Sequence, residues 1–313
     1  MTALRLENIV SNCFEKSGIS KDFLDGIDNF RTKYPVPSHL SPRIAQPKYH
    51  YIGKDVIENA VAAILCGENI LLAGPKATGK NVLAQNLSEA FGRPEWDISF
   101  HIDMDASYLI GTDTYDGDKV VFRPGPIYES AINGGFAVMD EINMARNEAL
   151  AVLHSTLDYR KTIDVPGYDR ITVAPSARFI GTMNYGYAGT RDLNEALSSR
   201  FVIINMPVLS PDDLTQLILD DFPSIKMSAA KQFSLLFDDI RKKCDSSEIS
   251  TKALDLRGLL DAIRLIQTGI PADRTLEMCI VNKTFDEYER GLVRDVINSR
   301  IGHKMSYSQV FGE

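Results

Sequence analysis

The residues best suited to chemistry in this sequence form a short loop between an apolar run and a helical pattern. The loop reads Gly-Pro-Lys-Ala-Thr-Gly-Lys-Asn over residues 74–81. Glycines at such a turn let backbone N–H groups converge on phosphate, and the following helix adds the partial positive charge of its N-terminus. Lys80 supplies a full charge for the β- and γ-phosphates of a nucleotide. We therefore predict a phosphate-binding loop with contacts from Gly74, Pro75, Lys76, Ala77, Thr78, Gly79, Lys80, Asn81 and Val82.

Two residues of this loop depart from the usual pattern. Asn81 stands where Ser or Thr normally offers a hydroxyl to Mg²⁺, and Ala77 stands where such loops often have Gly. An Asn carbonyl oxygen can ligate a hard cation, so Asn81 is a candidate magnesium ligand. The departures concern metal geometry and turnover more than nucleotide binding. A Gly-rich turn that holds no ligand is the alternative interpretation.

Two acids follow directly on a second apolar run. Residues 136–139 are apolar and lead into Asp140 and Glu141. A buried parallel strand carries such a pair to the carboxyl edge of its sheet, beside the phosphate-binding loop. Asp140 could there hold Mg²⁺, and Glu141 could orient or deprotonate an attacking water. A strand ending in a solvated acidic turn is the alternative, but the position after the loop favours the catalytic interpretation.

A third apolar run, residues 179–183, ends in Asn184. Its side chain could hydrogen-bond the attacking water or the γ-phosphate. A turn-forming Asn at a strand end is the common alternative. Because this run follows the one with the acidic pair, we favour the role at the γ-phosphate.

Several arginines could supply charge to a transition state. Arg200 stands at a predicted helix end just before a strand, where it could reach the γ-phosphate of a neighbouring subunit. Arg191 and Arg146 are secondary candidates that could equally form simple salt bridges. Arg257 lies near the start of a later helix and could fold back onto the phosphates, with Lys252 as a rival for that role.

The elements that position these residues follow from the apolar pattern. Five apolar runs separated by helical patterns predict an α/β fold, a parallel sheet with helices on both faces. The predicted strands cover residues 69–73, 97–101, 136–139, 178–183 and 201–206. Two hairpins interrupt this order at residues 112–123 and 161–173, because each contains a Gly-based turn between extended runs.

The chain divides into three predicted segments. Residues 1–50 form an N-terminal extension with a Pro-rich linker, since prolines cluster at its end. Residues 51–208 form the α/β nucleotide-binding domain. Residues 209–313 have apolar residues at helical spacing, which predicts a small all-helical domain that ends in a C-terminal helix.

Composition limits the classes of function. The chain has 313 residues, 44% of them hydrophobic, and its 34 basic and 42 acidic residues give a formal charge of −8. The acidic charge argues against nucleic acid as a partner, because phosphate binding needs clustered Lys and Arg. The four cysteines are far apart in sequence, which favours reduced thiols and a cytoplasmic protein. No apolar run approaches the roughly 20 residues of a membrane span.

These elements in this order resemble the AAA+ family, and in finer detail the MoxR-like ATPases with their CbbQ, NirQ and NorQ branch. Residues 123–127, 140–146 and 189–201 carry the finer likeness, and the whole resemblance covers about residues 50–265. The resemblance implies an AAA+ sheet domain followed by a helical lid, with ATP and Mg²⁺ as ligands. The implied roles are Walker A for Lys80, Walker B for Asp140 and Glu141, sensor 1 for Asn184, arginine finger for Arg200 and sensor 2 for Arg257.

The resemblance also implies a function. We expect an ATP hydrolase that forms a homo-oligomeric ring, in this family a hexamer, and that remodels or matures a protein client in a chaperone-like way, in some relatives with a von Willebrand factor A domain partner. The two hairpins would then face the pore of the ring. A nucleotide-gated assembly module with little or no hydrolysis is one alternative, and a motor subunit of a nucleic-acid system is another.

Overall fold

The computed structural model describes residue 14 and residues 17–185, 192–301 and 305–312. The chain forms two compact units, one of residues 1–75 and 79–207 and one of residues 76–78 and 208–313. The predicted division into an N-terminal extension, a nucleotide-binding domain and a helical lid is a division by function, and it stays a prediction. Of the helices in the described ranges, none has the length and apolar character that crossing a bilayer would take.

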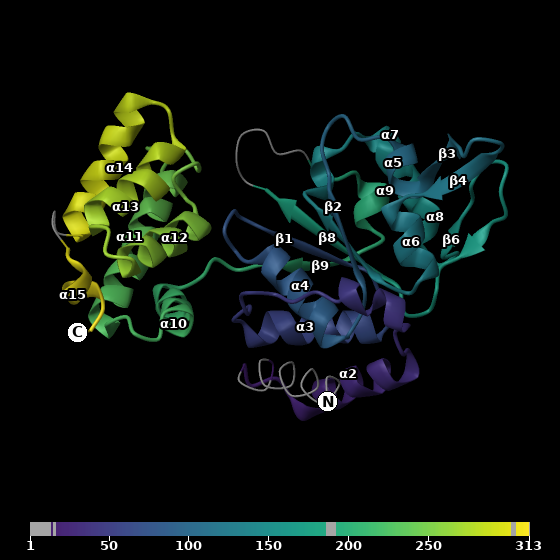
Figure 1. Cartoon of the computed structure of the whole chain (residues 1–313), viewed down its shortest axis with the longest axis horizontal. Helices are drawn as coiled ribbons and strands as arrows, with labels where there is room; N and C mark the ends of the chain where they lie inside the picture. Colours follow the sequence, from purple (N-terminus) through teal and green to yellow (C-terminus); the bar gives the residue numbers. More distant parts are fainter. Residues whose placement is uncertain (1–13, 15–16, 186–191, 302–304, 313) are drawn as a thin grey trace. The chain divides into compact units, whose positions relative to one another are not determined.

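The first unit is built on a sheet of five parallel strands in the order β2-β5-β8-β1-β9 (Figure 1). Because the strands are parallel, the carboxyl ends of β1, β5 and β8 meet at one edge of the sheet. The strands are β1 Ile70–Gly74, β2 Glu95–Ser99, β5 Phe136–Asp140, β8 Arg178–Asn184 and β9 Val202–Asn205. The prediction of an α/β fold with a parallel sheet is thus confirmed.

Neighbouring residues of β1 point into two different cores. Ile70 and Leu72 pack on one face with α2 Lys21–Lys33, α3 Lys54–Leu65 and α4 Lys80–Ala90. Leu71 packs on the opposite face. The helices that cover this second face are α5 Ala106–Ile110, α6 Pro126–Ile132, α7 Asn147–Leu150, α8 His154–Leu157 and α9 Glu195–Ser198. Burial on both faces explains the continuous apolar runs of the central strands.

Helix α2 and the segment after it are tied to the sheet layer. The ring of Phe30 meets that of Phe91 edge-on, with centroids 5.1 Å apart. The buried Arg93 donates from Nη1 to the carbonyl oxygen of Tyr34 at 2.5 Å. The residues from 38 to 43 form a 3-10 helix, and Ile44 then makes an antiparallel bridge to Pro94 beside β2.

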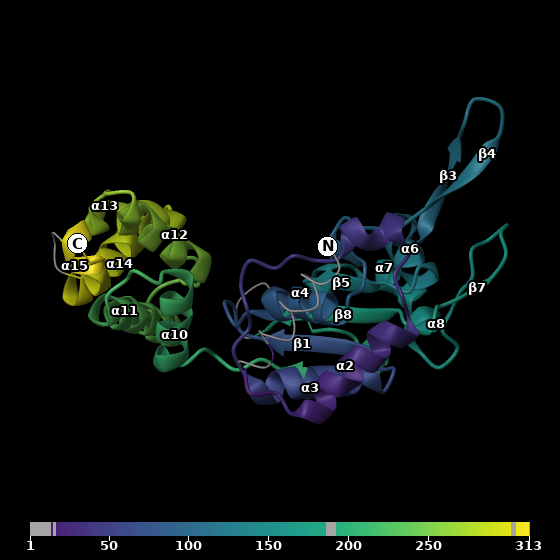
Figure 2. The same ribbon diagram turned by 60° about the horizontal axis from the view of Figure 1, so that its bottom comes forward.

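Both predicted hairpins are present. One consists of β3 Gly111–Tyr115 and β4 Val120–Pro124, and the other of β6 Thr162–Ile163 and β7 Ile171–Thr172. Figure 2 shows that both project from the same side of the first unit. The two hairpins contact each other, because Tyr168 donates its hydroxyl to Asp113 at 2.6 Å and its ring lies tilted against that of Phe122, with centroids 4.9 Å apart.

The second unit is helical, as predicted for the C-terminal region. Ser210 caps its first helix by accepting from the backbone N–H of Asp213 at 3.1 Å. A bridge between Ile225 and Phe311 joins its two ends. Its helices are α10 Pro211–Asp221, α11 Met227–Asp245, α12 Leu256–Gln267, α13 Ala272–Cys279, α14 Glu287–Arg300 and α15 Tyr307–Val310.

Strand β2 begins at Glu95, two residues earlier than predicted. The prediction was wrong because Glu95 is a buried acid, only 8% exposed, in a position that a charged residue rarely takes. Among the described residues its Oε2 has no hydrogen-bond partner. Burial, with the nearby Asp97 carboxyl adding to it and the Ser88 hydroxyl opposing it, raises the pKa of Glu95 from 4.5 to about 7.

This raised pKa predicts that the first unit loses stability as pH rises. The folded state favours the protonated form of Glu95. The stability that this protonated acid contributes is complete below pH 4.5 and is lost as pH rises through about 7. Glu95→Gln, which cannot ionise, should therefore exceed the natural chain in unfolding free energy by about 3 kcal/mol at pH 8 and by little at pH 4.5. Trp96, the single tryptophan, reports unfolding by fluorescence. The exposed hairpin variant Asp118→Asn is the control, and equal pH profiles for Glu95→Gln and the natural chain would contradict the assignment.

Candidate nucleotide site

The predicted phosphate-binding loop leaves the carboxyl end of β1 and enters α4. Helix α4 begins at Lys80, and its N-cap, Gly79, provides no side-chain hydrogen bond. The first N–H groups of the helix therefore have no internal cap and suit an anion. Gly79 has φ +81, and a Cβ there would lie 3.1 Å from the ring of Tyr51, so the position requires glycine. Ala77 also has a left-handed φ, +64, where an L side chain is strained.

Lys80 lies within this loop rather than in solvent. The residue is 7% exposed, and its Nζ donates to the carbonyl oxygens of Gly74 at 3.0 Å and Pro75 at 2.7 Å. Burial lowers the pKa of Lys80 to about 8, while the carboxylates of Asp140 and Glu141 oppose this change. A phosphate at the loop would favour the charged ammonium again.

Asp140 ends β5, and a threonine of the next strand orients it. Thr182 donates its hydroxyl to Asp140 Oδ1 at 2.6 Å and accepts the backbone N–H of Glu141 at 3.1 Å. The register explains this contact, because Met139 pairs with Gly181 and the following residues therefore lie side by side. One buried hydroxyl thus fixes both the carboxylate of Asp140 and the backbone of Glu141.

Glu141 and Asn184 contact each other directly. Asn184 Nδ2 donates to Glu141 Oε1 at 2.8 Å, and Asn143 Nδ2 donates to the carbonyl oxygen of Asn184 at 3.1 Å. Glu141 has φ +54, a conformation that costs a non-glycine residue energy and is often found at functional sites. The pair can therefore hold a water molecule between a carboxylate base and an amide.

Four residues of this region were not predicted from the sequence. Thr182 and Asn143 support the acidic pair, as described above. Tyr51 and Asn86 support the loop, because the Tyr51 N–H donates to Asn86 Oδ1 at 2.7 Å while its ring lies against Gly79. For Thr182 a signal existed, since it is a polar residue inside an apolar strand, two residues before Asn184.

The oxygen donors at this edge suit magnesium. The predicted ligands are Asp140, whose carboxylate Thr182 orients, and Asn81, the second residue of α4. In the described ranges no group of three or more His, Cys, Asp or Glu side chains could hold a metal. Magnesium at nucleotide sites takes most of its ligands from phosphate and water, so one or two protein oxygens suffice. Asn81 and Asp140 as magnesium ligands stay a prediction.

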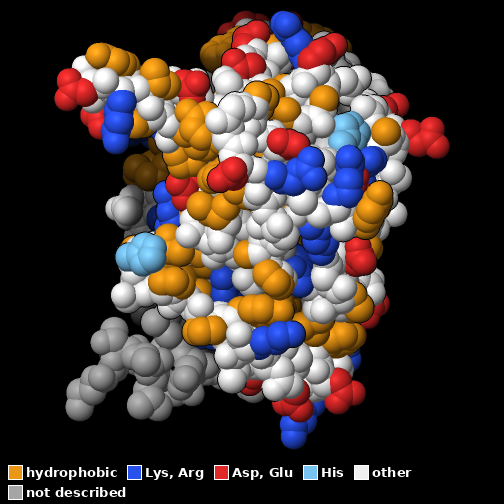
Figure 3. Space-filling model, turned by 90° about the vertical axis from the view of Figure 1, so that its right-hand side faces the viewer, with side chains coloured by type: hydrophobic (Ala, Val, Ile, Leu, Met, Phe, Trp, Pro, Cys, Tyr) orange, Lys and Arg blue, Asp and Glu red, His pale blue; other side chains and the backbone are white. Residues whose placement is uncertain are grey.

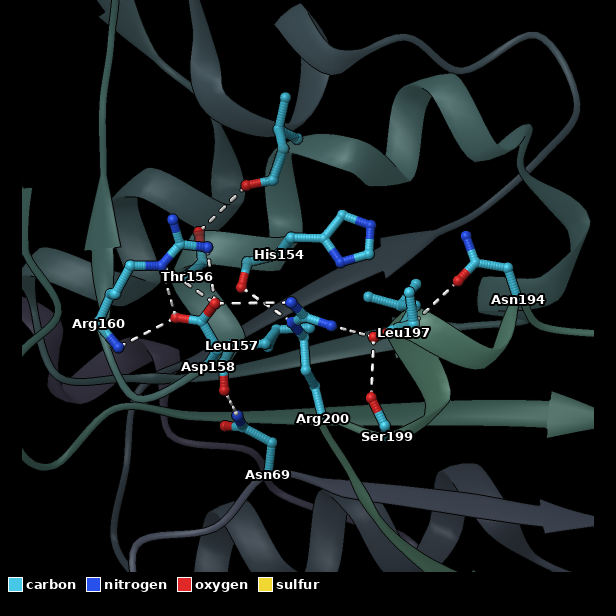
Figure 4. A network of polar contacts seen from close by, with 12 residues as sticks. Asn69, His154, Thr156, Leu157, Asp158, Arg160, Asn194, Leu197, Ser199 and Arg200 are labelled. Atoms are coloured by element: carbon cyan, nitrogen blue, oxygen red, sulfur yellow. Dashed lines mark hydrogen bonds and ion pairs between the residues drawn. The ribbon is translucent and has the colours of Figure 1, made fainter.

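Arg200, the predicted arginine finger, lies in a separate polar network (Figure 4). Its Nε donates to the carbonyl oxygen of His154 at 3.1 Å and its Nη1 to that of Ala196. Its Nη2 lies 3.6 Å from Oδ2 of Asp158, which also accepts from Arg160 at 2.7 Å. The side chain of Arg200 is 23% exposed.

This network lies at the opposite edge of the sheet from Lys80. Strand β9 runs parallel to β1, with Val202 beside Ile70, and Arg200 comes before β9 whereas the loop follows β1. A strand advances about 3.3 Å per residue, so on the order of 15 Å along the strands separates the two. The structure thus brings Lys80, Asp140, Glu141 and Asn184 together but does not bring Arg200 to them.

The secondary candidates are placed as follows. Arg146 forms an exposed ion pair with Asp103 at 3.8 Å. Arg191 lies outside the described residues. Arg257 is an exposed residue at the start of α12, and Lys252 is exposed shortly before that helix, both in the second unit. Their assignment to the lid sensor stays a prediction.

The parallel sheet, the loop after β1 and the polar strand ends of β5 and β8 define an AAA+ ATPase domain. Residues 69–201 match the family described as AAA domain (dynein-related subfamily). The chain belongs to this family. It is 32% identical over 267 residues to the uncharacterized protein YojN of Bacillus subtilis (strain 168), an alignment that covers 84% of this chain and 88% of YojN.

Further relatives come from staphylococci. The uncharacterized protein SH1500 of Staphylococcus haemolyticus is 33% identical over 258 residues, covering 80% of this chain and 98% of the relative. Among solved structures, NtrX from Brucella abortus aligns with 53% of this chain and 42% of its own at 19% identity and a TM-score of 0.40. The names of these relatives state neither a client nor a partner.

Removing the Thr182 hydroxyl should impair catalysis more than folding. Thr182→Val keeps the shape of the side chain but leaves Asp140 Oδ1 and the Glu141 N–H without their shared partner. We expect kcat for ATP to fall roughly tenfold or more, since supporting contacts of this kind are typically worth 10- to 100-fold. Steady-state hydrolysis measures this, with Thr112→Val on the exposed hairpin as the matched control. An unchanged kcat for Thr182→Val would show that the hydroxyl does not position the acids.

Proposed function

We propose that this chain is a ring-forming, Mg²⁺-dependent ATPase of the MoxR-like branch that remodels or matures a protein client. The observation that supports it best is the separation of Arg200 from the other site residues. Lys80, Asp140, Glu141 and Asn184 surround one position, whereas Arg200 lies at the far edge of the same sheet. A neighbouring subunit would supply its Arg200 to complete the site, which requires an oligomer.

In this proposal each residue has one role. The loop and Lys80 would bind the phosphates of ATP, and Asp140 with Asn81 would hold Mg²⁺, which would supply positive charge at the γ-phosphate. Glu141, fixed by Asn184, orients or deprotonates the attacking water. Arg200 of the neighbour stabilises charge that develops on the transferred group. Arg257 keeps the sensor 2 role that the MoxR-like assignment suggests for it.

The hairpins would carry the contact to the client. Their joined sides present exposed side chains, with Tyr115 at 72% and Val120 at 62% on one hairpin and Tyr159 at 92% before the other. Figure 3 looks onto this side of the molecule, where hydrophobic side chains are spread among Lys and Arg side chains. Exposed apolar side chains of this kind suit an unfolded or partly folded polypeptide. The MoxR-like assignment suggests a von Willebrand factor A domain protein as the partner. It also suggests that six copies of this chain form the ring.

A nucleotide-gated assembly module with little hydrolysis is the second candidate. The strained Ala77 and the amide of Asn81, where a hydroxyl is usual, favour it. The intact pair of Asp140 and Glu141 favours hydrolysis instead.

Steady-state ATP hydrolysis with Mg²⁺, measured across protein concentrations, separates the two candidates. If two neighbouring subunits together form each ATP site, which we call a shared site, the hydrolysis rate per subunit should rise steeply with protein concentration as rings form. Binding of ATP with oligomerisation but without turnover would support the nucleotide-gated assembly module. No affinity for any nucleotide would contradict both.

A further inference from the structure

The carboxylate of Asp158 lies between two arginines at the edge of the sheet that is distant from Lys80. It belongs to the turn between α8 and β6, and its side chain is 13% exposed. We propose that Asp158 is a positioning residue for Arg200, and that Arg160 fixes the Asp158 carboxylate for this purpose. The inference rests on the proposed function, in which Arg200 acts on the ATP of a neighbouring subunit.

Arg160 holds Asp158 in one orientation. Its Nε donates to both carboxylate oxygens at 3.1 Å, its Nη2 donates to Oδ2 at 2.7 Å, and its backbone N–H donates to Oδ1 at 3.0 Å. A bidentate contact combined with a backbone hydrogen bond leaves the carboxylate little freedom. The same contacts with Arg160 hold the pKa of Asp158 below its usual range, so the carboxylate stays charged.

The turn that carries Asp158 is itself fastened to the sheet. The buried Asn69 donates from Nδ2 to the carbonyl oxygen of Leu157 at 3.0 Å and accepts the N–H of Phe179 at 3.2 Å. Lys161 holds the other end of the turn, because its Nζ donates to the carbonyl oxygen of Gly67 at 2.9 Å. The carboxylate is therefore a fixed point relative to the strands (Figure 4).

Three fixed acceptors then define the position of Arg200. Two are the carbonyl oxygens of His154 and Ala196, and the third is Asp158 Oδ2, 3.6 Å from Nη2. The carbonyls are neutral, so only Asp158 offsets the two positive charges. One net positive charge remains, which can attract a triphosphate, whereas without the carboxylate the two guanidiniums would repel each other.

The geometry also weighs against a purely structural role for this ion pair. At 3.6 Å the pair of Asp158 and Arg200 is longer than a hydrogen bond. At this length the attraction between the two charges orients the guanidinium without a hydrogen bond. The carboxylate provides a fixed orientation for the Arg200 guanidinium, which must meet a phosphate on another subunit.

The test is Asp158→Asn in the full chain, which keeps the size of the side chain and removes its charge. We expect kcat for ATP to fall roughly tenfold or more while KM changes little, because an arginine finger acts mainly in the transition state. Asp245→Asn is the matched control, since Asp245 is an exposed carboxylate that forms an ion pair with Arg241 at 3.1 Å in the helical unit, outside both hairpins. Trp96 fluorescence verifies that both variants fold.

Mixed rings distinguish positioning from general damage. Asp158→Asn subunits mixed with Glu141→Gln subunits should regain activity, because each supplies the half-site that the other lacks. Asp158→Asn mixed with Arg200→Ala should stay inactive, because both variants are defective in the same half-site. If Asp158→Asn does not fold, Arg160→Gln takes its place, since it loosens the carboxylate without removing it.

The outcomes separate the two proposals. If Arg200→Ala and Glu141→Gln fail to complement each other, the shared site itself is wrong. If they do complement while Asp158→Asn keeps the natural kcat, or regains activity with Arg200→Ala, the role of Asp158 is wrong and the shared site stands.

Discussion

Glu141→Gln should abolish ATP hydrolysis and leave ATP binding intact. The substituted amide can still accept the hydrogen bond from Asn184 through its oxygen, so the local structure should be kept. It cannot take a proton from water, and removal of a general base typically costs 10²- to 10⁴-fold in rate. We therefore expect kcat to fall by at least about 100-fold, with the dissociation constant for ATP changed little.

Two measurements and one control make this result specific. Hydrolysis is followed as phosphate release, and binding is followed with a fluorescent ATP analogue on the same preparation. Glu148→Gln is the control, because Glu148 is an exposed acid shortly after the catalytic pair. Persistent turnover in Glu141→Gln would show that another group activates the water. Loss of binding would instead mean that the carboxylate supports the loop.

A trapped ring would also show what the enzyme acts on. If hydrolysis drives release of the client, Glu141→Gln with ATP should hold its client long enough for co-purification from the native host. This experiment uses the chemistry of the site to identify the client, which the fold leaves open.

The central strands could be predicted because their sequence pattern and their burial agree. Residues 70–73 are apolar without interruption, and the structure buries this strand on both faces. The start of β2 was missed for the opposite reason. Glu95 reads as a surface residue in the sequence, yet it lies buried in a strand with its pKa raised. One charged residue at the start of β2 was enough for the prediction to miss the first two residues of the strand.

The positions of the two predicted catalytic acids could be inferred from the sequence, but the groups that hold them could not. Asp140 and Glu141 follow an apolar run, and this local pattern is visible in the sequence. Thr182 contacts them only because β5 and β8 are neighbours in a known register. The same applies to Asp158, which meets Arg200 from 42 residues earlier in the chain (200 − 158). Contacts across strands depend on tertiary structure, and a single sequence does not give the pairing order.

The second large effect expected is that of Arg200→Ala, with kcat falling about 10³-fold or more, as is typical when an arginine finger is removed. Because Arg200 lies at the end of the sheet distant from Lys80, we predict that the effect acts between subunits. Binding of ATP should therefore persist, and so should oligomerisation, unless the arginine also supports the interface. Arg170→Ala is the control, since this arginine is exposed and pairs only with Asp164 among the described residues.

Complementation in mixed rings decides whether Arg200 acts between subunits. Arg200→Ala subunits retain Glu141, and Glu141→Gln subunits retain Arg200, so a ring that contains both has some interfaces with a complete site. Activity should therefore reappear when the two inactive variants are mixed, and it should rise and fall with their ratio. An arginine that acted within its own subunit would give no recovery at any ratio. The parallel register of β1 and β9 keeps Arg200 away from the site of its own subunit. A lack of recovery would therefore mean that Arg200 has a structural role.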